Sequence, residues 1–166
     1  IEVIKGPASS LYGSNSIGGA VNFITQGPPT GYAGDVSLQG DNYHYKRVDA
    51  NGGFTSGKFG MYAGGYVAHQ TDSWQDYSDF DKYSGNFKTV YDFDNSTKLT
   101  TAASYNYLNT QTPGSLDSAH FYNKSYGSNQ RFTYRKVNSF RASTRLDHTW
   151  NEKNATFVTL FYRYNS

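Results

Sequence analysis

Residue types that can carry catalysis or bind metals occur in this chain, but their spacing suits neither role. The four histidines (His44, His69, His120 and His148) lack the i, i+4 spacing that places two imidazoles on one helix face to bind zinc. There is no cysteine to act as nucleophile or metal ligand, and no Gly-x-Ser-x-Gly elbow. The acidic residues are spread along the chain instead of being grouped in one segment. We therefore expect no enzymatic activity, no metal site and no cofactor.

A glycine-rich stretch, residues 13–19, has a composition that could cradle a phosphate. It lacks the Lys-Ser/Thr pair that follows in a P-loop, and no amphipathic helix pattern begins after it. Glycine permits positive φ and close backbone approach, so the stretch predicts a set of tight turns. The formal net charge is +2, from 15 basic and 13 acidic residues, and no Lys/Arg block is present. A nucleic-acid partner is therefore not expected.

Two stretches, about 71–82 and 109–133, combine aromatic with polar side chains. Aromatic rings can stack on flat ligand groups while neighbouring polar groups orient the ligand. The same composition is also normal for an exposed surface, and both interpretations stay open. The candidate ligand-facing residues are Trp74, Tyr77, Phe80, His120, Tyr122, Tyr126 and Arg131.

The elements that must position these stretches are predicted to be β-strands. Mean hydropathy is −0.73, and no run approaches the ~18 apolar residues that a transmembrane helix needs. Aromatic residues nevertheless make up 17% of the chain, with 16 Tyr and 11 Phe, which is typical of strands with one apolar and one polar face. Seven segments have strand character: 32–41, 45–55, 58–70, 83–94, 97–108, 134–149 and 155–165.

In five of these seven segments, apolar and polar residues alternate cleanly, which places them on opposite faces of a sheet. Segments 58–70 and 155–165 alternate less clearly. The outward mid-strand residues are often small, which makes a poor surface for packing two sheets together, and aromatic residues gather near the predicted strand ends. Those aromatic residues are Tyr91, Phe93, Tyr105, Tyr107, Trp150, Tyr162 and Tyr164. The polar faces carry charged residues, which would suit the wall of a water-filled lumen inside a barrel. They are Asp35, Arg47, Asp49, Lys88, Asp92, Arg141, Arg145 and Asp147.

The connections between the predicted strands alternate in length. Tight polar turns are expected at 56–57, 94–96 and 151–154, whereas two of the three intervening connections, 71–82 and 109–133, are long. Short turns at one end and long loops at the other are the asymmetry of outer-membrane barrels. A soluble meander has no reason to sort its connections in this way.

The first 25 residues carry the most specific motif, a strand, a glycine-punctuated loop and a second strand. The string closely resembles the last part of the plug domain of TonB-dependent outer-membrane receptors, which leads into the barrel. The matching positions are Ile1, Glu2, Val3, Gly6, Pro7, Ser9, Leu11, Tyr12, Gly13, Ile17, Gly18, Gly19, Val21 and Asn22. The resemblance covers only these residues, and the remainder of the chain is judged on its pattern.

The resemblance implies an all-β fold, a partial antiparallel transmembrane β-barrel preceded by the end of a plug domain. Residues 1–27 would be the plug's C-terminal part, 28–31 a linker, and 32–166 about seven strands of a larger barrel. The family's barrel has 22 strands, and the chain starts inside a strand without Met or signal peptide, so we expect a fragment. Motif residues would have a structural or gating role; they are Gly6, Pro7, Ser9, Leu11, Tyr12, Gly13, Ile17, Gly18, Gly19 and Asn22. Some polar-face charges would contact the plug, and the candidates are Asp35, Arg47, Asp49, Lys88, Asp92, Arg141 and Arg145.

The resemblance also implies a function and partners. The intact protein would take up a scarce nutrient through the outer membrane of a Gram-negative cell, powered by TonB through an N-terminal segment absent from this sequence. An iron–siderophore complex is the default cargo, with cobalamin, another metal chelate or an oligosaccharide as alternatives that the sequence does not separate. Outer-membrane lipid would contact the apolar face. The alternative from another class is a soluble or cell-surface β-sandwich that binds carbohydrate.

Overall fold

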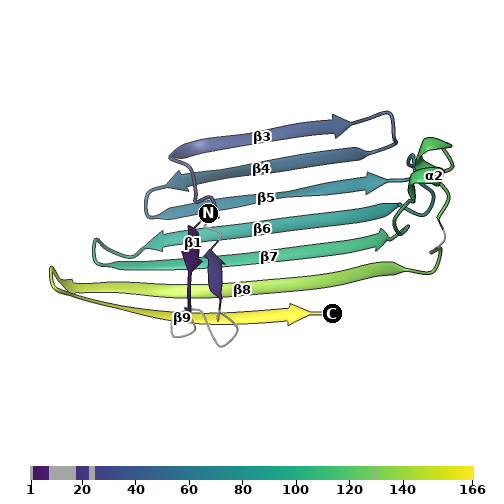
Figure 1. Cartoon of the computed structure of the whole chain (residues 1–166). Helices are drawn as coiled ribbons and strands as arrows, with labels where there is room; N and C mark the ends of the chain where they lie inside the picture. The colour runs from purple at the N-terminus through teal and green to yellow at the C-terminus, as the bar shows by residue number, and fades with distance from the viewer. Residues whose placement is uncertain (1, 8–17, 23–24, 129) are drawn as a thin grey trace.

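Almost all regular structure in the chain is β. The computed structural model describes residues 2–7, 18–22, 25–128 and 130–166. Seven strands form one antiparallel sheet in which every strand pairs with its neighbours along the chain (Figure 1). They are β3 (Gly31–Gly40), β4 (Lys46–Ser56), β5 (Phe59–Gln70), β6 (Phe80–Asp92), β7 (Thr97–Gln111), β8 (Tyr134–Asn151) and β9 (Asn154–Asn165). A separate two-stranded hairpin contains β1 (Glu2–Lys5) and β2 (Gly19–Asn22).

The seven strands expected from the alternation are all present, and the antiparallel all-β fold is confirmed. Two boundaries were wrong. The loop expected at 71–82 ends at residue 79, because Phe80 already pairs with Gln70 and Thr110. The loop expected from 109 begins at 112, because β7 continues to Gln111, and it contains a short helix that the pattern did not predict, α2 (Ser118–Tyr122). In the part of the chain that the structure describes, no helix is long and apolar enough to cross a membrane.

The strand register places most of the large apolar residues on one side of the sheet, here called the apolar face. Exceptions on the other side include Tyr66 of β5 and Phe157 and Phe161 of β9, in the two segments that alternate less clearly. Residues that pair directly across the sheet form rows. Successive rows on this face are two residues apart along each strand. The middle row consists of Val36, Ala50, Gly65, Gly85, Tyr105, Phe140 and Tyr164. Tyr105, expected near a strand end, therefore lies in mid-strand. The opposite side, the polar face, carries most of the charged residues of the strands.

The apolar face ends abruptly toward one end of the sheet. The row that begins with Leu38 and Val48 is followed, two residues further along each strand, by a polar row. That row consists of Gly40, Lys46, His69, Asp81, Asn109 and Lys136. Within it, the His69 ring contacts the Asp81 carboxylate across the β5–β6 pair. The same face of the sheet thus changes from apolar to charged within one row.

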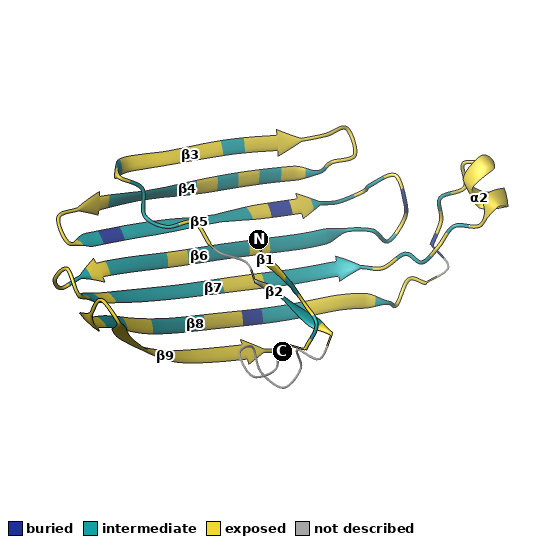
Figure 2. Ribbon diagram, turned by 60° about the vertical axis from the view of Figure 1, so that its left-hand side comes forward, coloured by how far each residue is buried: buried dark blue, intermediate teal, exposed yellow. Residues whose placement is uncertain are grey.

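The sheet is a single layer without a hydrophobic core. Among the described residues Ala68 is the only buried hydrophobic side chain, whereas Val36 is 69% exposed and Leu160 72% exposed. Figure 2 shows exposed residues along β3 and β9, the two edge strands, which do not pair with each other. The sheet is therefore open, and the described residues form neither a closed barrel nor two stacked sheets.

Connections of different length are separated to opposite ends of the sheet, as the sequence predicted (Figure 1). Residues 57–58, 93–96 and 152–153 form tight turns at one end, where Gly57 adopts a φ of 57°. The loops 41–45, 71–79 and 112–133 all lie at the other end. The first of these loops is short, which the sequence also predicted.

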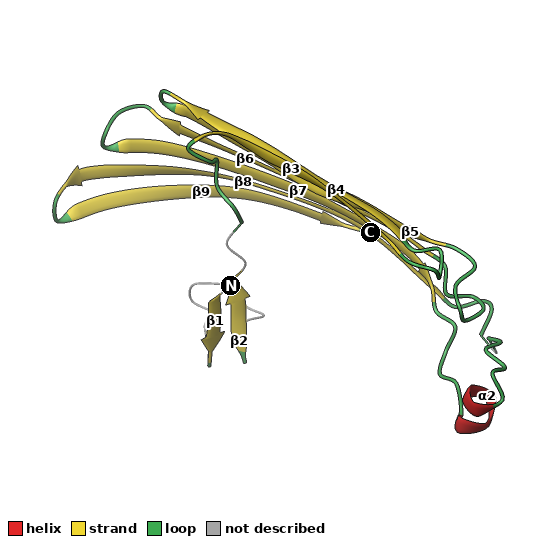
Figure 3. Cartoon of the chain, turned by 90° about the horizontal axis from the view of Figure 1, so that it is seen from above, coloured by secondary structure: helices red, strands yellow, loops and turns green. Residues whose placement is uncertain are grey.

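The chain enters the sheet across its polar face. Pro28 and Pro29 lie on the sheet beside two strand glycines that leave room for their rings. A Cβ on Gly60 would lie 2.8 Å from the Pro28 Cβ, and one on Gly53 would lie 2.8 Å from the Pro29 Cδ. Seen from above, the β1–β2 hairpin lies on the side toward which the sheet curves (Figure 3).

Candidate functional site

The three loops at one end of the sheet pack together, and we call them the loop cluster. The Asp76 backbone N–H donates to the Tyr126 carbonyl at 3.0 Å, which joins the β5–β6 loop to the β7–β8 loop. The Gln70 side-chain amide donates to the Tyr43 carbonyl at 3.3 Å, which joins the β3–β4 loop to the end of β5. Side chains distant in sequence are therefore held beside one another.

A cavity of about 320 Å³ lies within the loop cluster. Two of the predicted ligand-facing residues form part of its wall: the Trp74 ring packs edge-on against the Tyr126 ring, with centroids 5.4 Å apart. The lining residues are Asp41, Tyr43, Gln70, Trp74, Phe121 and Tyr126. Sequence reasoning missed Asp41 and Tyr43 because the loop 41–45 is too short to stand out, and it missed Gln70 because that residue ends a strand, β5. The Asp-Asn-Tyr turn signal at residues 41–43 could have identified it.

A second cavity, of about 350 Å³, lies beside the first and contains another two predicted residues, Tyr77 and Arg131. The Arg131 guanidinium contacts the Asp76 carboxylate at 3.4 Å, and both side chains are well exposed. An exposed ion pair of this kind is weak, so either partner is free to exchange its contact for a ligand.

The remaining predicted ligand-facing residues lie apart from these cavities. Tyr122 ends α2 and is 80% exposed, and its ring meets only that of Phe121 edge-on among the ring contacts of the described residues. The His120 backbone N–H and ring both contact the Asp117 carboxylate, the N-cap of α2. These hydrogen bonds lower the pKa of Asp117. Phe80, expected in the loop, lies in β6 with the Lys82 Nζ 4.1 Å from its ring centroid.

Backbone strain gathers in the loop cluster. Four non-glycine residues among those described have positive φ, and all of them lie in these loops: His44, Asp72, Tyr77 and Lys124. Such residues cost free energy and persist where surrounding contacts fix the conformation. For example, the ring Nδ1 of His44 lies 3.1 Å from the Asp72 carbonyl oxygen, so two of these residues contact each other.

Most of the candidate plug-contacting charges pair within the sheet. Arg47 binds Asp49 at 2.6 Å, and Arg145 binds Asp147 at 2.6 Å. Asp92 contacts Lys98 of the next strand at 3.5 Å. Asp35 lies on β3 at the polar face and is exposed.

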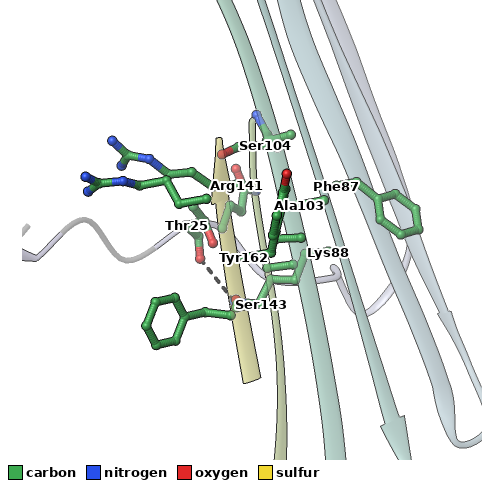
Figure 4. Close-up of a pocket in the computed structure, with 14 residues that line it drawn as sticks. Thr25, Phe87, Lys88, Ala103, Ser104, Arg141, Ser143 and Tyr162 are labelled. Carbon is green, nitrogen blue, oxygen red and sulfur yellow. Dashed lines mark hydrogen bonds between the residues drawn. The ribbon is translucent and has the colours of Figure 1, made fainter. Parts of the chain in front are cut away.

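The other two candidates, Lys88 and Arg141, line a groove of about 400 Å³ on the polar face of β6–β9. The Lys88 Nζ donates to the Thr25 carbonyl at 3.3 Å, so β6 contacts the segment that follows the β1–β2 hairpin (Figure 4). Figure 4 also shows Phe87 pointing to the opposite side of the sheet from Arg141. We call this feature the basic groove.

Part of the N-terminal motif can be placed. Gly6 follows β1 with a φ of 95°, and its N–H donates to the Gly18 carbonyl at 3.4 Å. Pro7 follows Gly6, Gly19 has a φ of 147°, and Asn22 ends β2. The motif residues Ser9, Leu11, Tyr12, Gly13 and Ile17 lie outside the described residues. Their proposed gating role stays a prediction.

Within the described ranges 2–7, 18–22, 25–128 and 130–166, no three His, Cys, Asp or Glu side chains gather as a metal site would require. The loop cluster offers aromatic rings for stacking and a carboxylate, and the basic groove offers positive charge.

No protein-family model matches the chain. Two curated proteins are similar to a short part of the chain. Both are named iron-regulated outer membrane virulence protein, and they come from a classical and an El Tor strain of Vibrio cholerae serotype O1. Each is 53% identical over 38 residues, which is 23% of this chain. The chain covers 6% of the length of these relatives. The local similarity links the chain to a protein named as iron-regulated and as an outer-membrane protein.

Proposed function

We propose that this chain forms part of the wall, and the end of the plug, of an outer-membrane receptor that takes up a scarce nutrient with energy supplied through TonB. An iron–siderophore complex is the proposed cargo. The apolar face contacts lipid, the polar face lines the lumen, and the loop cluster faces the outside of the cell. The observation that carries the proposal is the bounded band of exposed apolar side chains on a single-layered sheet.

The dimensions of that band support contact with lipid. From Phe93, which continues the apolar face at the turn end, to Tyr83 there are ten residue steps along the chain. At about 3.3 Å per residue and a tilt of about 40°, this length gives a height of about 25 Å, the height of the apolar band of outer-membrane barrels. The charged row of Lys46, His69 and Asp81 would then lie at the level of the headgroups.

Two further observations support the transport function. The long loops share one end of the sheet with two cavities, which suits ligand capture from outside. The local similarity to a protein named for its regulation by iron supports iron as part of the cargo. The coupling to TonB and the plug role of the hairpin rest on the motif of the first 25 residues.

Single-cysteine labelling tests the membrane assignment, because the chain has no cysteine of its own. In the full-length gene product, we expect Ala103→Cys on the apolar face to react with a lipid-soluble maleimide and resist a water-soluble one. The matched variant Ala102→Cys, one residue earlier on the polar face, should react with the water-soluble reagent. Equal water accessibility of both cysteines would end the proposal, and resistance of Ala103→Cys to both reagents would favour a soluble β-sandwich, in which this face is buried against a second sheet. Loss of growth on ferric siderophores after deletion of the gene would test the cargo.

A further inference from the structure

The polar face of β6–β9 carries more positive charge than the sheet neutralises. Its two carboxylates, Asp92 and Asp147, are already paired with Lys98 and Arg145. Five further cations on this face have no carboxylate within ion-pair distance among the described residues. They are Lys82, Lys88, Arg135, Arg141 and Arg163. This surplus runs from the loop end of the sheet to the basic groove.

Two of these cations oppose each other directly. Arg141 on β8 and Arg163 on β9 are register partners, and the row continues through Ser104 to Asn86. Like charges at directly opposed positions destabilise a strand pair, so the arrangement is unfavourable unless an anion lies between them. Both arginines line the basic groove together with Lys88. Figure 4 shows Arg141 and Ser104 on the side of the strands that faces the groove.

We propose that Arg141, Arg163 and Lys88 form a binding site for a multiply charged oxyanion. Guanidinium groups bind paired carboxylate, phosphate or catecholate oxygens with two parallel hydrogen bonds, and the hydroxyls of Ser104 and Ser143 add neutral donors. The site is open to water, so binding is weak enough to reverse, as a passing cargo requires. This inference rests on the proposed function, because it identifies the cargo of the proposed receptor as an anionic chelate.

The charge of the groove is tested at Ser104, which lies between Asn86 and Arg141 in the row. In a Ser104→Cys variant of the full-length gene product, we expect a sulfonate-bearing thiol reagent to react at least about tenfold faster than a trimethylammonium-bearing one. Ser37→Cys, on the same face beside Asp49, provides the comparison position and should show no such preference. Adding Arg141→Gln and Arg163→Gln to the Ser104→Cys variant should abolish the preference.

A matched control removes the same charge elsewhere. Lys136→Gln with Lys153→Gln takes two cations from the β8–β9 ribbon, one from the apolar face and one from the turn. In the Ser104→Cys background, this pair should leave the labelling unchanged. An equal loss of preference in this control would show a general field effect and overturn the site.

Protection by added anions tests binding itself. Inorganic pyrophosphate and a ferric tris-catecholate complex should each slow the labelling of the Ser104→Cys variant, and neither should do so once Arg141→Gln and Arg163→Gln are added. Protection by the ferric complex at a tenfold lower concentration than pyrophosphate would assign the site to chelate cargo, whereas equal potency would assign it to simple oxyanions. Absence of protection by both overturns the proposal. Labelling of the Ser104→Cys variant requires no membrane, so its failure is distinct from failure of the membrane assignment in the Ala103→Cys variant.

Discussion

Trp74 meets Tyr126 edge-to-face, with ring centroids 5.4 Å apart and an interplanar angle of 84°. The contact joins the β5–β6 loop to the β7–β8 loop and forms one wall of the 320 Å³ cavity. Nearby, the Asp76 N–H to Tyr126 carbonyl hydrogen bond fixes the same two loops through the backbone. The cavity is therefore formed before any ligand arrives, which lowers the ordering cost of binding.

Replacing Trp74 with alanine should loosen the loop cluster without unfolding the sheet. An edge-to-face aromatic pair contributes about 0.5–1.5 kcal/mol beyond its buried area, so the β7–β8 loop should open more often. Limited proteolysis of the full-length gene product should cut within residues 112–133 several times faster in the variant. Trp150→Ala, at the opposite end of the sheet, serves as control and should leave the cleavage rate unchanged. Equal rates for Trp74→Ala and the wild type would show that the ring contact does not hold the loops.

Two paired glycines in the middle row should respond oppositely to the same substitution. Gly65 and Gly85 are register partners on the apolar face. A Cβ on Gly65 would collide with the Ser84 carbonyl, whereas a Cβ on Gly85 would meet no atom within 4 Å. Gly65→Ala should lower the free energy of unfolding by about 1–3 kcal/mol, because the collision forces a backbone shift. Gly85→Ala should leave the free energy of unfolding unchanged or raise it by about 0.4–1 kcal/mol, because alanine makes the unfolded chain less flexible.

Urea denaturation of both glycine variants, followed by tryptophan fluorescence in detergent, measures the difference. The two proteins lose the same glycine flexibility in the unfolded state, so their comparison isolates the contact at Ser84. Similar midpoints for the two variants would contradict the register between β5 and β6.

The strands could be predicted from the sequence because each has one apolar and one polar face. Alternation at period two appears wherever one face meets water, and polar turn residues mark the ends. β6 illustrates the limit: Phe80 and Lys82 belong to it, but their Asp neighbours resemble the preceding loop, so its start was placed at residue 83. Long-range pairing with Gln70 and Thr110, invisible in a local pattern, extends the strand.

The sites were less predictable because they depend on contacts between distant segments. Trp74 and Tyr126 were each selected for composition, yet nothing in the sequence shows that their rings meet. Arg141 was identified as a polar-face charge, but its opposition to Arg163 follows only from the register of β8 with β9. Asp41 and Tyr43 were missed because their loop has five residues and becomes part of a cavity only through the neighbouring loops.

The Asp94 turn should make stability depend on pH in the acid range. The Ser96 backbone N–H donates to the carboxylate at 2.7 Å and the Thr97 hydroxyl at 3.3 Å, and these bonds hold the pKa of Asp94 below its ordinary value. A lowered folded-state pKa means that the stabilisation is present above the unfolded-state value of about 3.9 and is lost as the pH falls through the folded-state value. Asp94→Ala should therefore be less stable than wild type at pH 7, with the difference narrowing below pH ~4.

Urea midpoints measured between about pH 7 and pH 3 test this dependence. Glu152→Ala, in the β8–β9 turn at the same end of the sheet, removes a carboxylate that accepts no hydrogen bond within the described residues. Its midpoint should follow that of the wild type at every pH. A wild-type advantage over Asp94→Ala that stayed constant to the acid end of this range would show that the carboxylate charge plays no part.

An arginine placed at neighbouring positions of β7 should distinguish the two faces energetically. Ala103 lies one row from the middle of the apolar face, beside Phe87 and Ala142, and Ala102 lies on the polar face opposite Lys88. Ala103→Arg should cost about 2–4 kcal/mol, because it places a charge near the bilayer midplane. Ala102→Arg should cost less than about 1 kcal/mol, because its main penalty is the like charge of Lys88 and the basic groove in a wet surrounding.

Assembly of both variants in outer membranes, scored by heat-modifiable gel migration of the full-length gene product, provides the measurement. The substitutions are chemically identical and adjacent in the chain, so strand propensity and side-chain size cancel in the comparison. What differs is the medium that each side chain enters and the neighbours that it meets there. Normal assembly of Ala103→Arg together with failure of Ala102→Arg would show that the polar face, not the apolar face, contacts lipid. The polar row of Lys46, His69 and Lys136 would then need a different explanation.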